Sequence, residues 1–306
     1  MKVKTLLIGS GDFAISIFQA ALKADFLEIV GIVTQPDKPV GRKQEIQGSP
    51  VFEALKSEQN IDWFKPVKFR HEHQSILDKT KPDLVLVASY GQILPKEFIE
   101  FPEHKALNFH GSILPQLRGA VPVPMAILQG LNQTGVTLQV MSEGMDEGDI
   151  ISVKTIDLIG TETTQSLMQN LSELGVAILQ NDLPKYLRKE VEPIPQNHTL
   201  ATYCYKSDIE KEKAQIHFDT DINTSDRMIR AFSPWPVAYV MIDGKMLKIF
   251  KAKIYSQHRN TDSEIKIFRE GKSLLLKLST GTLELIEVQL EGKKRDSAIN
   301  YLFLAN

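Results

Sequence analysis

The 306-residue sequence predicts an α/β fold over its first two-thirds and a small all-β domain after it. In the first part, short apolar runs alternate with helix-length segments, a pattern typical of a mostly parallel sheet that carries helices on both faces. After about residue 206 the pattern changes to short strands separated by turn signals, Asp243-Gly244 and Thr280-Gly281. Together these observations indicate a Rossmann-like domain followed by a small OB-like β-barrel.

The first domain is expected to begin with a buried strand at 3–8 and to end with a long helix. Between them we expect strands at 29–34, 84–88, 106–109, 136–140 and 150–156, and helices at 14–23, 51–57 and 122–128. Four apolar residues recur at helical spacing, which predicts one long amphipathic helix to about Lys189: Leu167, Leu171, Leu174 and Ile178. The second domain is expected to hold strands at 237–242, 245–252, 274–278 and 283–290 and a terminal helix at 296–304.

The segment 191–206 is expected to be a linker between the domains, because it is polar and carries Pro193 and Pro195. The predicted boundaries are therefore 1–190 for the first domain and 207–306 for the second.

Composition restricts the compartment and the partners. The single cysteine, Cys204, excludes an internal disulfide framework and a thiolate metal site, and favours a reducing compartment, the cytoplasm. No apolar run approaches the roughly 18 residues that span a bilayer, so we expect no membrane partner. Residues 1–206 carry 20 Lys and Arg against 24 Asp and Glu, and residues 207–306 carry 16 against 14. A nucleic-acid partner would therefore meet local basic patches rather than a basic surface.

Three polar residues follow predicted strands and form a candidate catalytic group. Asn108 and His110 are one residue apart, so both side chains leave the same face of an extended strand. Asp146 follows the strand at 136–140. An amide, an imidazole and a carboxylate are the groups that acyl transfer uses to stabilise an oxyanion and to move protons. The residues alone also allow non-catalytic roles: Asn108 as a capping residue, His110 as a hydrogen-bonded structural histidine, and Asp146 as part of a solvated acidic loop.

Other chemistries fit these residues less well. The acidic loop around Asp146 lacks the ligand spacing of an EF-hand, and His71 and His73 have no third ligand, so no metal is expected. Ser112 does not lie in a nucleophile elbow.

The segment from Gly9 to Ala14 follows a strand and matches the dinucleotide fingerprint G-x-G-x-x-A. That fingerprint also requires an acid after the second strand, where this chain has Thr34 and Gln35. We therefore favour a tight turn that needs small residues over a site for NAD(P).

Two loops follow strands at the expected binding edge of the sheet. The apolar loop from Tyr90 to Pro95 follows the strand at 84–88 and can flank a flat ring or pack on its own helix. The connection 35–50 is long and polar, and long connections of this kind are usually functional or disordered.

Four stretches resemble the formyltransferases that use 10-formyltetrahydrofolate, and within them the branch that acts on methionyl-tRNA. They are Asn108-Phe109-His110-Gly111-Ser112-Ile113-Leu114-Pro115 with Arg118-Gly119 and Asp146, Thr34-Gln35-Pro36-Asp37-Lys38-Pro39-Val40-Gly41-Arg42, Tyr90-Gly91-Gln92-Ile93-Leu94-Pro95, and Arg230-Ala231-Phe232-Ser233-Pro234-Trp235-Pro236. The resemblance covers both predicted domains.

The resemblance implies transfer of a formyl group from 10-formyltetrahydrofolate to the α-amino group of methionine on initiator tRNA, for translation initiation, without a metal. It implies catalytic roles for Asn108, His110 and Asp146. The folate contacts that it implies are Ser112, Ile113, Leu114, Pro115, Tyr90, Ile93 and Leu94. The tRNA contacts that it implies are Arg42 and Lys43, and the β domain at 207–306 is expected to help hold the tRNA. The basic run after Arg42 is thinner than the family's, since Glu45 follows closely.

We expect a monomer. An N-formyltransferase acting on the amine of a nucleotide-linked sugar shares the catalytic trio and is the alternative. A non-catalytic RNA-binding protein is a third reading, which the intact trio disfavours.

Overall fold

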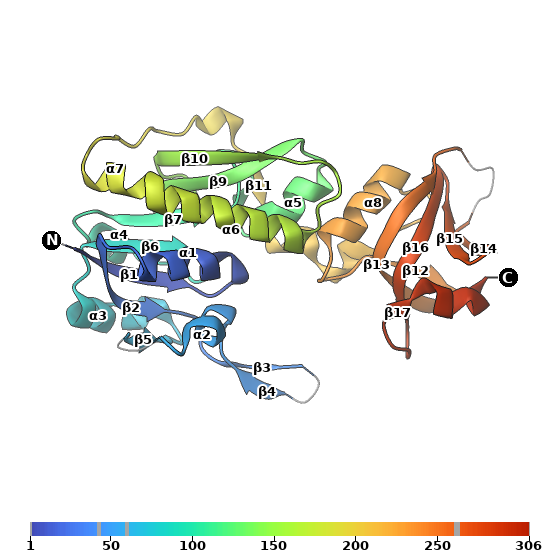
Figure 1. Ribbon diagram of the computed structural model, residues 1–306, viewed down its shortest axis with the longest axis horizontal. Coiled ribbons are helices and arrows are strands. Elements are labelled where there is room, and N and C mark those ends of the chain that lie inside the picture. Colours follow the sequence, from blue (N-terminus) through green and yellow to red (C-terminus); the bar gives the residue numbers. More distant parts are fainter. Residues whose placement is uncertain (1, 42–43, 59–60, 260–263, 306) are drawn as a thin grey trace. The chain divides into compact units, whose positions relative to one another are not determined.

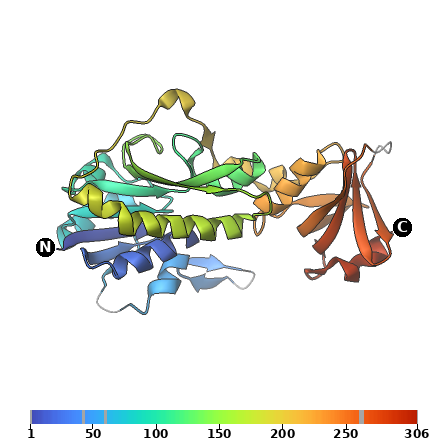
Figure 2. The same cartoon turned by 45° about the horizontal axis from the view of Figure 1, so that its top comes forward.

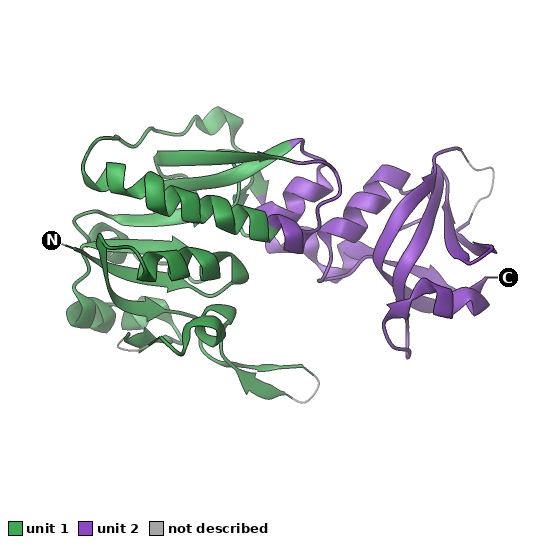
Figure 3. Cartoon of the chain, viewed as in Figure 1, with its two compact units in different colours: residues 1–120, 133–157, 168–203 green, residues 121–132, 158–167, 204–306 purple. Residues whose placement is uncertain are grey.

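A computed structural model describes residues 2–41, 44–58, 61–259 and 264–305. These residues form two compact units (Figure 3). Unit 1 comprises 1–120, 133–157 and 168–203, and unit 2 comprises 121–132, 158–167 and 204–306. No helix within the described ranges is long and apolar enough to cross a membrane.

Unit 1 is built on a seven-stranded sheet of order β10-β9-β7-β6-β1-β2-β5 (Figure 1). Its strands are β1 (Val3–Gly9), β2 (Leu27–Val33), β5 (Trp63–Phe64), β6 (Leu84–Ala88), β7 (Ala106–His110), β9 (Gln133–Val140) and β10 (Ile150–Asp157). The first five pair in parallel, while β9 runs antiparallel to both β7 and β10. The mostly parallel sheet predicted from the sequence is confirmed.

Helices cover both faces of this sheet. They are α1 (Asp12–Leu22), α2 (Pro50–Leu55), α3 (Phe69–Thr80), α4 (Lys96–Glu100), α6 (Thr164–Asn181) and α7 (Leu183–Leu187). On one face, alternate strand residues such as Ile8 and Val87 share a buried cluster with Phe69 of α3 and Phe98 of α4. Helices α1 and α6 lie side by side over the sheet in both ribbon views (Figures 1 and 2). A Cβ on Gly175 of α6 would lie 2.5 Å from Ile17 Cδ1, so this glycine permits the close approach to α1.

The prediction of one helix to Lys189 was wrong. Helix α6 ends at Asn181, and the separate short helix α7 begins at Leu183. Pro184 lacks a backbone N–H and disfavours helical geometry in the residue before it, but it suits the first turn of a new helix.

The long connection 35–50 contains a hairpin of β3 (Lys38–Val40) and β4 (Glu45–Gln47), whose strand residues are all exposed. A cluster of buried hydroxyl groups holds its base. Ser10 Oγ lies 3.2 Å from Thr34 Oγ1 and accepts from Gln35 N at 2.9 Å, and Thr34 Oγ1 also bonds Ser49 Oγ. The hairpin therefore leaves the sheet from an ordered base.

Unit 2 is an antiparallel sheet of order β12-β13-β16-β15-β14, with β17 added to β16. The strands are β12 (Tyr239–Ile242), β13 (Lys245–Ser256), β14 (Lys266–Glu270), β15 (Ser273–Leu278), β16 (Gly281–Leu290) and β17 (Asp296–Ser297). The sheet curls into a half-barrel (Figure 1), which confirms the predicted small β domain. Helices α5 (Pro122–Leu128) and α8 (Ile222–Ala231) pack on each other. The short remaining elements are β8 (Arg118–Gly119), β11 (Tyr203–Cys204), η1 (His198–Leu200), η2 (Lys206–Ile209) and η3 (Lys211–Ala214).

The predicted terminal α-helix at 296–304 was also wrong. Asp296 and Ser297 pair with β16, and Ala298–Leu304 forms the 3-10 helix η4. The buried residues of η4 are Ala298 and Tyr301, three positions apart, which is the repeat of a 3-10 turn.

The segment expected to be a linker belongs to unit 1 as far as residue 203. Ile194 exchanges backbone hydrogen bonds of 2.8 and 2.9 Å with Ile150, so this segment packs beside β10. Each compact unit consists of several separate segments of the chain. The predicted domain boundaries at residues 190 and 207 therefore stay a prediction.

Candidate active site

The site lies at the carboxyl end of β7. Phe109 points towards α6, where Gly175 lies beside it, so the alternation of a strand directs Asn108 and His110 to the opposite face. In the antiparallel pairing of β7 with β9, Asn108 is opposite Gln139 and His110 is opposite Thr137. Four polar side chains are thus brought to one face of two adjacent strands.

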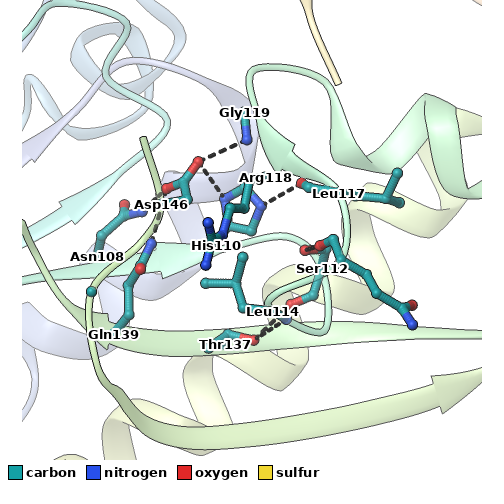
Figure 4. A network of polar contacts seen from close by, with 12 residues as sticks. Asn108, His110, Ser112, Leu114, Leu117, Arg118, Gly119, Thr137, Gln139 and Asp146 are labelled. Carbon is teal, nitrogen blue, oxygen red and sulfur yellow. Dashed lines mark hydrogen bonds and ion pairs between the residues drawn. The ribbon is translucent and has the colours of Figure 1, made fainter. Parts of the chain in front are cut away.

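Asp146 reaches this group from the loop after β9 (Figure 4). Its Oδ1 accepts hydrogen bonds from Asn108 Nδ2 at 3.2 Å and from Gln139 Nε2 at 2.9 Å. Its Oδ2 accepts from the backbone N–H of Gly119 at 2.8 Å and lies 3.5 Å from His110 Nδ1. The Asp146 backbone has a φ of 54°, in the left-handed region that Asp and Asn tolerate better than most residues.

The hydrogen bonding of His110 defines which nitrogen carries its proton. Nε2 lies 2.8 Å from the carbonyl oxygen of Leu117, which can only accept, so Nε2 carries a hydrogen. Nδ1, which faces Asp146 Oδ2, is therefore an acceptor in the neutral ring and a donor in the imidazolium. This geometry suits a pair that takes up and releases one proton.

The loop after β7 is bound to β9 by two hydrogen bonds of Thr137. Thr137 Oγ1 donates to the carbonyl of Ser112 at 2.7 Å and accepts from Leu114 N at 3.1 Å. The Leu114-Pro115 peptide is cis. Ser112 and Leu114 are buried, whereas Ile113 and Pro115 are half-buried and keep some surface for a ligand.

The loop from Tyr90 to Pro95 presents one exposed side chain and buries another. The Tyr90 ring meets Phe69 edge to face at 5.7 Å, and its hydroxyl is buried with no hydrogen-bond partner among the described residues. Burial raises the pKa of this phenol. Leu94 packs on the same cluster, while Ile93 is 76% exposed. Of the three predicted folate contacts in this loop, Ile93 is the most exposed, Leu94 is half-buried and Tyr90 is buried.

The predicted tRNA contacts Arg42 and Lys43 lie outside the described residues. The strands on either side of them, β3 and β4, are exposed.

Sequence reasoning did not assign site roles to four residues that hold the catalytic group: Gln139, Gly119, Arg118 and Gln196. Gln139 is a buried amide on strand β9, but Gln133, Thr134 and Thr137 are polar residues of the same strand, so the sequence does not single it out. Arg118 belongs to a quoted motif, but its burial could not be read from the sequence. Its guanidinium donates to Gln196, to Glu147 Oε1 at 3.3 Å and to Tyr203 Oη at 3.1 Å.

Two of the carboxylates near Asp146 pair with separate cations. Glu143 pairs with Lys96 at 2.7 Å, and Glu147 pairs with Arg118. No cluster of His, Cys, Asp and Glu with the makings of a metal site occurs in the described part of the chain. His73 is held by its own helix, since its Nδ1 lies 2.9 Å from the carbonyl oxygen of Arg70 and its ring stacks on Phe69.

Known proteins resemble this chain along its length. A model of the formyl transferase family matches residues 1–183, and a model of the formyl transferase C-terminal domain matches residues 208–303. The methionyl-tRNA formyltransferase of Methylacidiphilum infernorum is 39% identical over 306 residues, with 98% of this chain and 94% of the relative covered. That of Bacillus cytotoxicus is 34% identical over 305 residues, covering 98% and 95%.

Solved structures share the fold at lower identity. An N-formyltransferase from Helicobacter canadensis, in complex with folinic acid and dTDP-3-aminofucose, has a TM-score of 0.67 at 17% identity, covering 92% of this chain and 98% of that one. HypX from Aquifex aeolicus in complex with tetrahydrofolic acid has a TM-score of 0.67 at 18% identity, covering 99% and 47%. The two family models and the full-length relatives agree, and the chain belongs to the formyl transferase family, in its methionyl-tRNA formyltransferase branch.

Proposed function

We propose that this protein transfers the formyl group of 10-formyltetrahydrofolate to the α-amino group of methionine esterified to initiator tRNA. The observation that carries the proposal is likeness to methionyl-tRNA formyltransferases over 98% of the chain. The convergence of Asn108, His110 and Asp146 at one sheet edge supports it independently.

In this reaction the α-amino nitrogen attacks the formyl carbon, the carbonyl oxygen becomes an oxyanion, and the bond from that carbon to the folate nitrogen then breaks. The amine must be neutral to attack, which is accessible near pH 7 because α-amino groups titrate at about 7.7–8.0. One proton leaves the attacking nitrogen and one reaches the leaving nitrogen, so the site must both accept and supply a proton.

Asn108 is suited to hold the oxyanion. An amide NH₂ has two hydrogens, and Asp146 Oδ1 takes one of them. The second hydrogen has no acceptor among the described residues, so it can donate to substrate. A well-aimed donor of this kind contributes about 3 kcal/mol to the transition state.

Asp146 and His110 are suited to move the protons. Asp146 Oδ2 lies 3.5 Å from His110 Nδ1, so a proton taken by the carboxylate can pass to the ring and return. His110 Nε2 is already bound to the carbonyl of Leu117. A direct hydrogen bond from this nitrogen to the formyl oxygen would require it to leave that carbonyl.

The binding surfaces follow from the same geometry. Ile113, Pro115 and Ile93 keep exposed apolar surface near the carboxyl ends of β7 and β6, where a pterin ring would bind. The hairpin β3–β4, with Arg42 and Lys43 between its strands, would contact tRNA phosphates.

The test is a substrate panel with 10-formyltetrahydrofolate as donor. Charged initiator tRNA is compared with nucleotide-linked amino sugars, because sugar N-formyltransferases share the fold. Formylation of methionyl-tRNA at a kcat/KM at least a hundredfold above that of every sugar is expected. The reverse order of substrates would replace the tRNA assignment with the sugar one.

A further inference from the structure

Arg118 is a buried cation that fixes the orientation of one amide. Its side chain is 1% exposed, and its Nε and Nη2 donate to Gln196 Oε1 at 3.2 and 2.7 Å. A guanidinium can only donate, so the oxygen of the Gln196 amide must face Arg118. The NH₂ of Gln196 must then face the other way.

The NH₂ of Gln196 holds the Asp146 loop. It donates to the carbonyl oxygens of Asp146 and Gly148 at 2.9 and 2.6 Å, and lies 3.4 Å from Gln139 Oε1. Gln196 comes fifty positions after Asp146 in the sequence, from the segment expected to be a passive linker.

Gln139 continues the same direction of donation. Its Oε1 faces the NH₂ of Gln196, so its own NH₂ faces Asp146 Oδ1, to which it donates at 2.9 Å. Gln139 and Gln196 are both buried, at 2% and 6% exposure. Donation therefore runs one way, from Arg118 through two amides to the carboxylate, and at the longer contact with Gln139 the NH₂ of Gln196 shares a hydrogen with a backbone carbonyl.

We propose that Gln196 is a positioning residue for the reaction, acting in a relay of Arg118, Gln196 and Gln139 that aims the carboxylate of Asp146. The proposal rests on the proposed function in assigning the proton-transfer role to Asp146. The relay fixes the carboxylate at Oδ1 and the loop at its backbone, which leaves Oδ2 to accept from the Gly119 N–H and to face His110. Small displacements of a catalytic group are costly, so this order matters for turnover.

Gln196→Glu separates positioning from simple structural support. The new carboxylate still accepts from Arg118, and this contact becomes a charged pair. If Gln196 served only to anchor Arg118, the variant would therefore keep near-parental turnover. The NH₂ donor is lost, however, and an oxygen then faces the carbonyls of Asp146 and Gly148. We expect kcat to fall about tenfold to a hundredfold, since a misplacement of about 1 Å costs up to that factor. KM for tRNA and for the folate should stay within about threefold of the parent.

Two further variants complete the kinetic test. Asn197→Ala removes the neighbouring side chain, which caps η1 and takes no part in the relay, and should retain the parental kcat. In an Asp146→Asn background, Gln196→Glu should lower kcat no further, because both changes then act through the same carboxylate. A full multiplicative loss in that background, or parental kcat in Gln196→Glu alone, would overturn the relay.

A structural readout makes the test independent of the substrate. Crystal structures of the parent and of Gln196→Glu are compared without substrate, and we expect the Asp146 carboxyl group to move by more than about 0.5 Å, the tolerance of a catalytic constellation. An unmoved carboxyl group would contradict the relay even if turnover fell. If instead Asp146→Asn keeps full turnover, the catalytic assignment fails, while the crystal structures still decide whether Gln196 positions this loop.

Discussion

Asp146 combines an uncommon backbone conformation with donors on both carboxylate oxygens. Asn108 and Gln139 donate to one oxygen and Gly119 to the other, while a φ of 54° directs the side chain back towards β7. Asn accepts the left-handed region as Asp does, so replacing one by the other changes charge and hydrogen bonding without imposing a new backbone preference.

Asp146→Asn is expected to lower turnover by about a hundredfold or more, because general acid–base catalysis contributes about 10²–10⁴-fold. The new NH₂ would also face donors whichever way the amide turned. Single-turnover rates at saturating tRNA measure the effect, and the circular dichroism spectrum should match the parent. A rate within about threefold of the parent would remove Asp146 from the mechanism, since the loss of a general acid–base catalyst costs far more than that.

The two glycines of the Asp146 loop make a matched pair of substitutions. A Cβ on Gly148 would lie 1.6 Å from the carbonyl oxygen of Val140, a backbone atom that cannot step aside. On Gly144 it would meet the carboxylate end of Glu147 at 2.3 Å, and this flexible side chain can rotate away.

Gly148→Ala should therefore lower the free energy of unfolding by about 1–3 kcal/mol and reduce kcat, as overpacking forces the loop to shift. Gly144→Ala should have the smaller effect on both, because only the side chain of Glu147 has to shift within its contact with Arg118. Urea unfolding and steady-state kinetics on the two proteins provide the comparison. If Gly148→Ala lost no more stability or turnover than Gly144→Ala, the loop would have to accommodate a methyl group beside Val140.

At the scale of elements, the register of β7 and β9 assembles the site. Asn108 pairs with Gln139 and His110 with Thr137, so a shift of one residue would send one member of each pair to the opposite face. The same strands bury Phe109 and Leu138. Core packing therefore enforces the register on which the chemistry depends.

The turn between β1 and α1 shows how a sequence motif can serve packing. The backbone N–H groups of Ser10 and Gly11 donate to the carbonyl of Ser89 at 3.1 and 3.4 Å, so they do not point at a phosphate. A Cβ on Gly9 would lie 2.5 Å from the carbonyl oxygen of Ala88 and 2.8 Å from Phe18 Cζ. The fingerprint glycines thus meet the demands of close approach between β1, β6 and α1.

From this turn we predict that NADH does not bind with micromolar affinity, whereas a folate analogue does. A fluorescence titration of the protein with each ligand tests this. Tight NADH binding that a folate analogue fails to displace would restore the dinucleotide interpretation of the motif.

At the scale of the whole molecule, charge is the property most relevant to a tRNA partner. The net charge is −2, with acidic residues in excess up to 206 and basic residues in excess after it. The exposed strand β4 of the hairpin β3–β4 carries Glu45, which follows Arg42 by three positions in the sequence. This carboxylate opposes the phosphates that the hairpin is proposed to contact.

Glu45→Lys is expected to lower KM for tRNA and to steepen its dependence on salt, because each added phosphate contact releases counterions. Glu28→Lys makes the same change of net charge on β2, at an exposed position away from the hairpin, and is the control. Values of kcat/KM between low and physiological salt, at saturating folate, give the comparison. An equal response to both substitutions would mean that the hairpin acts only through the overall charge.

By itself the sequence determined the alternation of strands and helices, the all-β character of the second domain and the grouping of Asn108 with His110, because these follow from periodicity along the chain. It misjudged the end of α6 and the terminal 3-10 helix, where a proline and a strand pairing outweighed the local pattern.

Tertiary structure alone decided which amides face Asp146. Gln139 approaches from the opposite strand, and Arg118 and Gln196 meet although 78 positions separate them. Such contacts depend on how each buried amide or guanidinium is oriented. The spacing of apolar residues predicts which face of a strand is buried, but not this orientation. The same holds for Tyr90, which its apolar neighbours draw into the core rather than to the sheet edge.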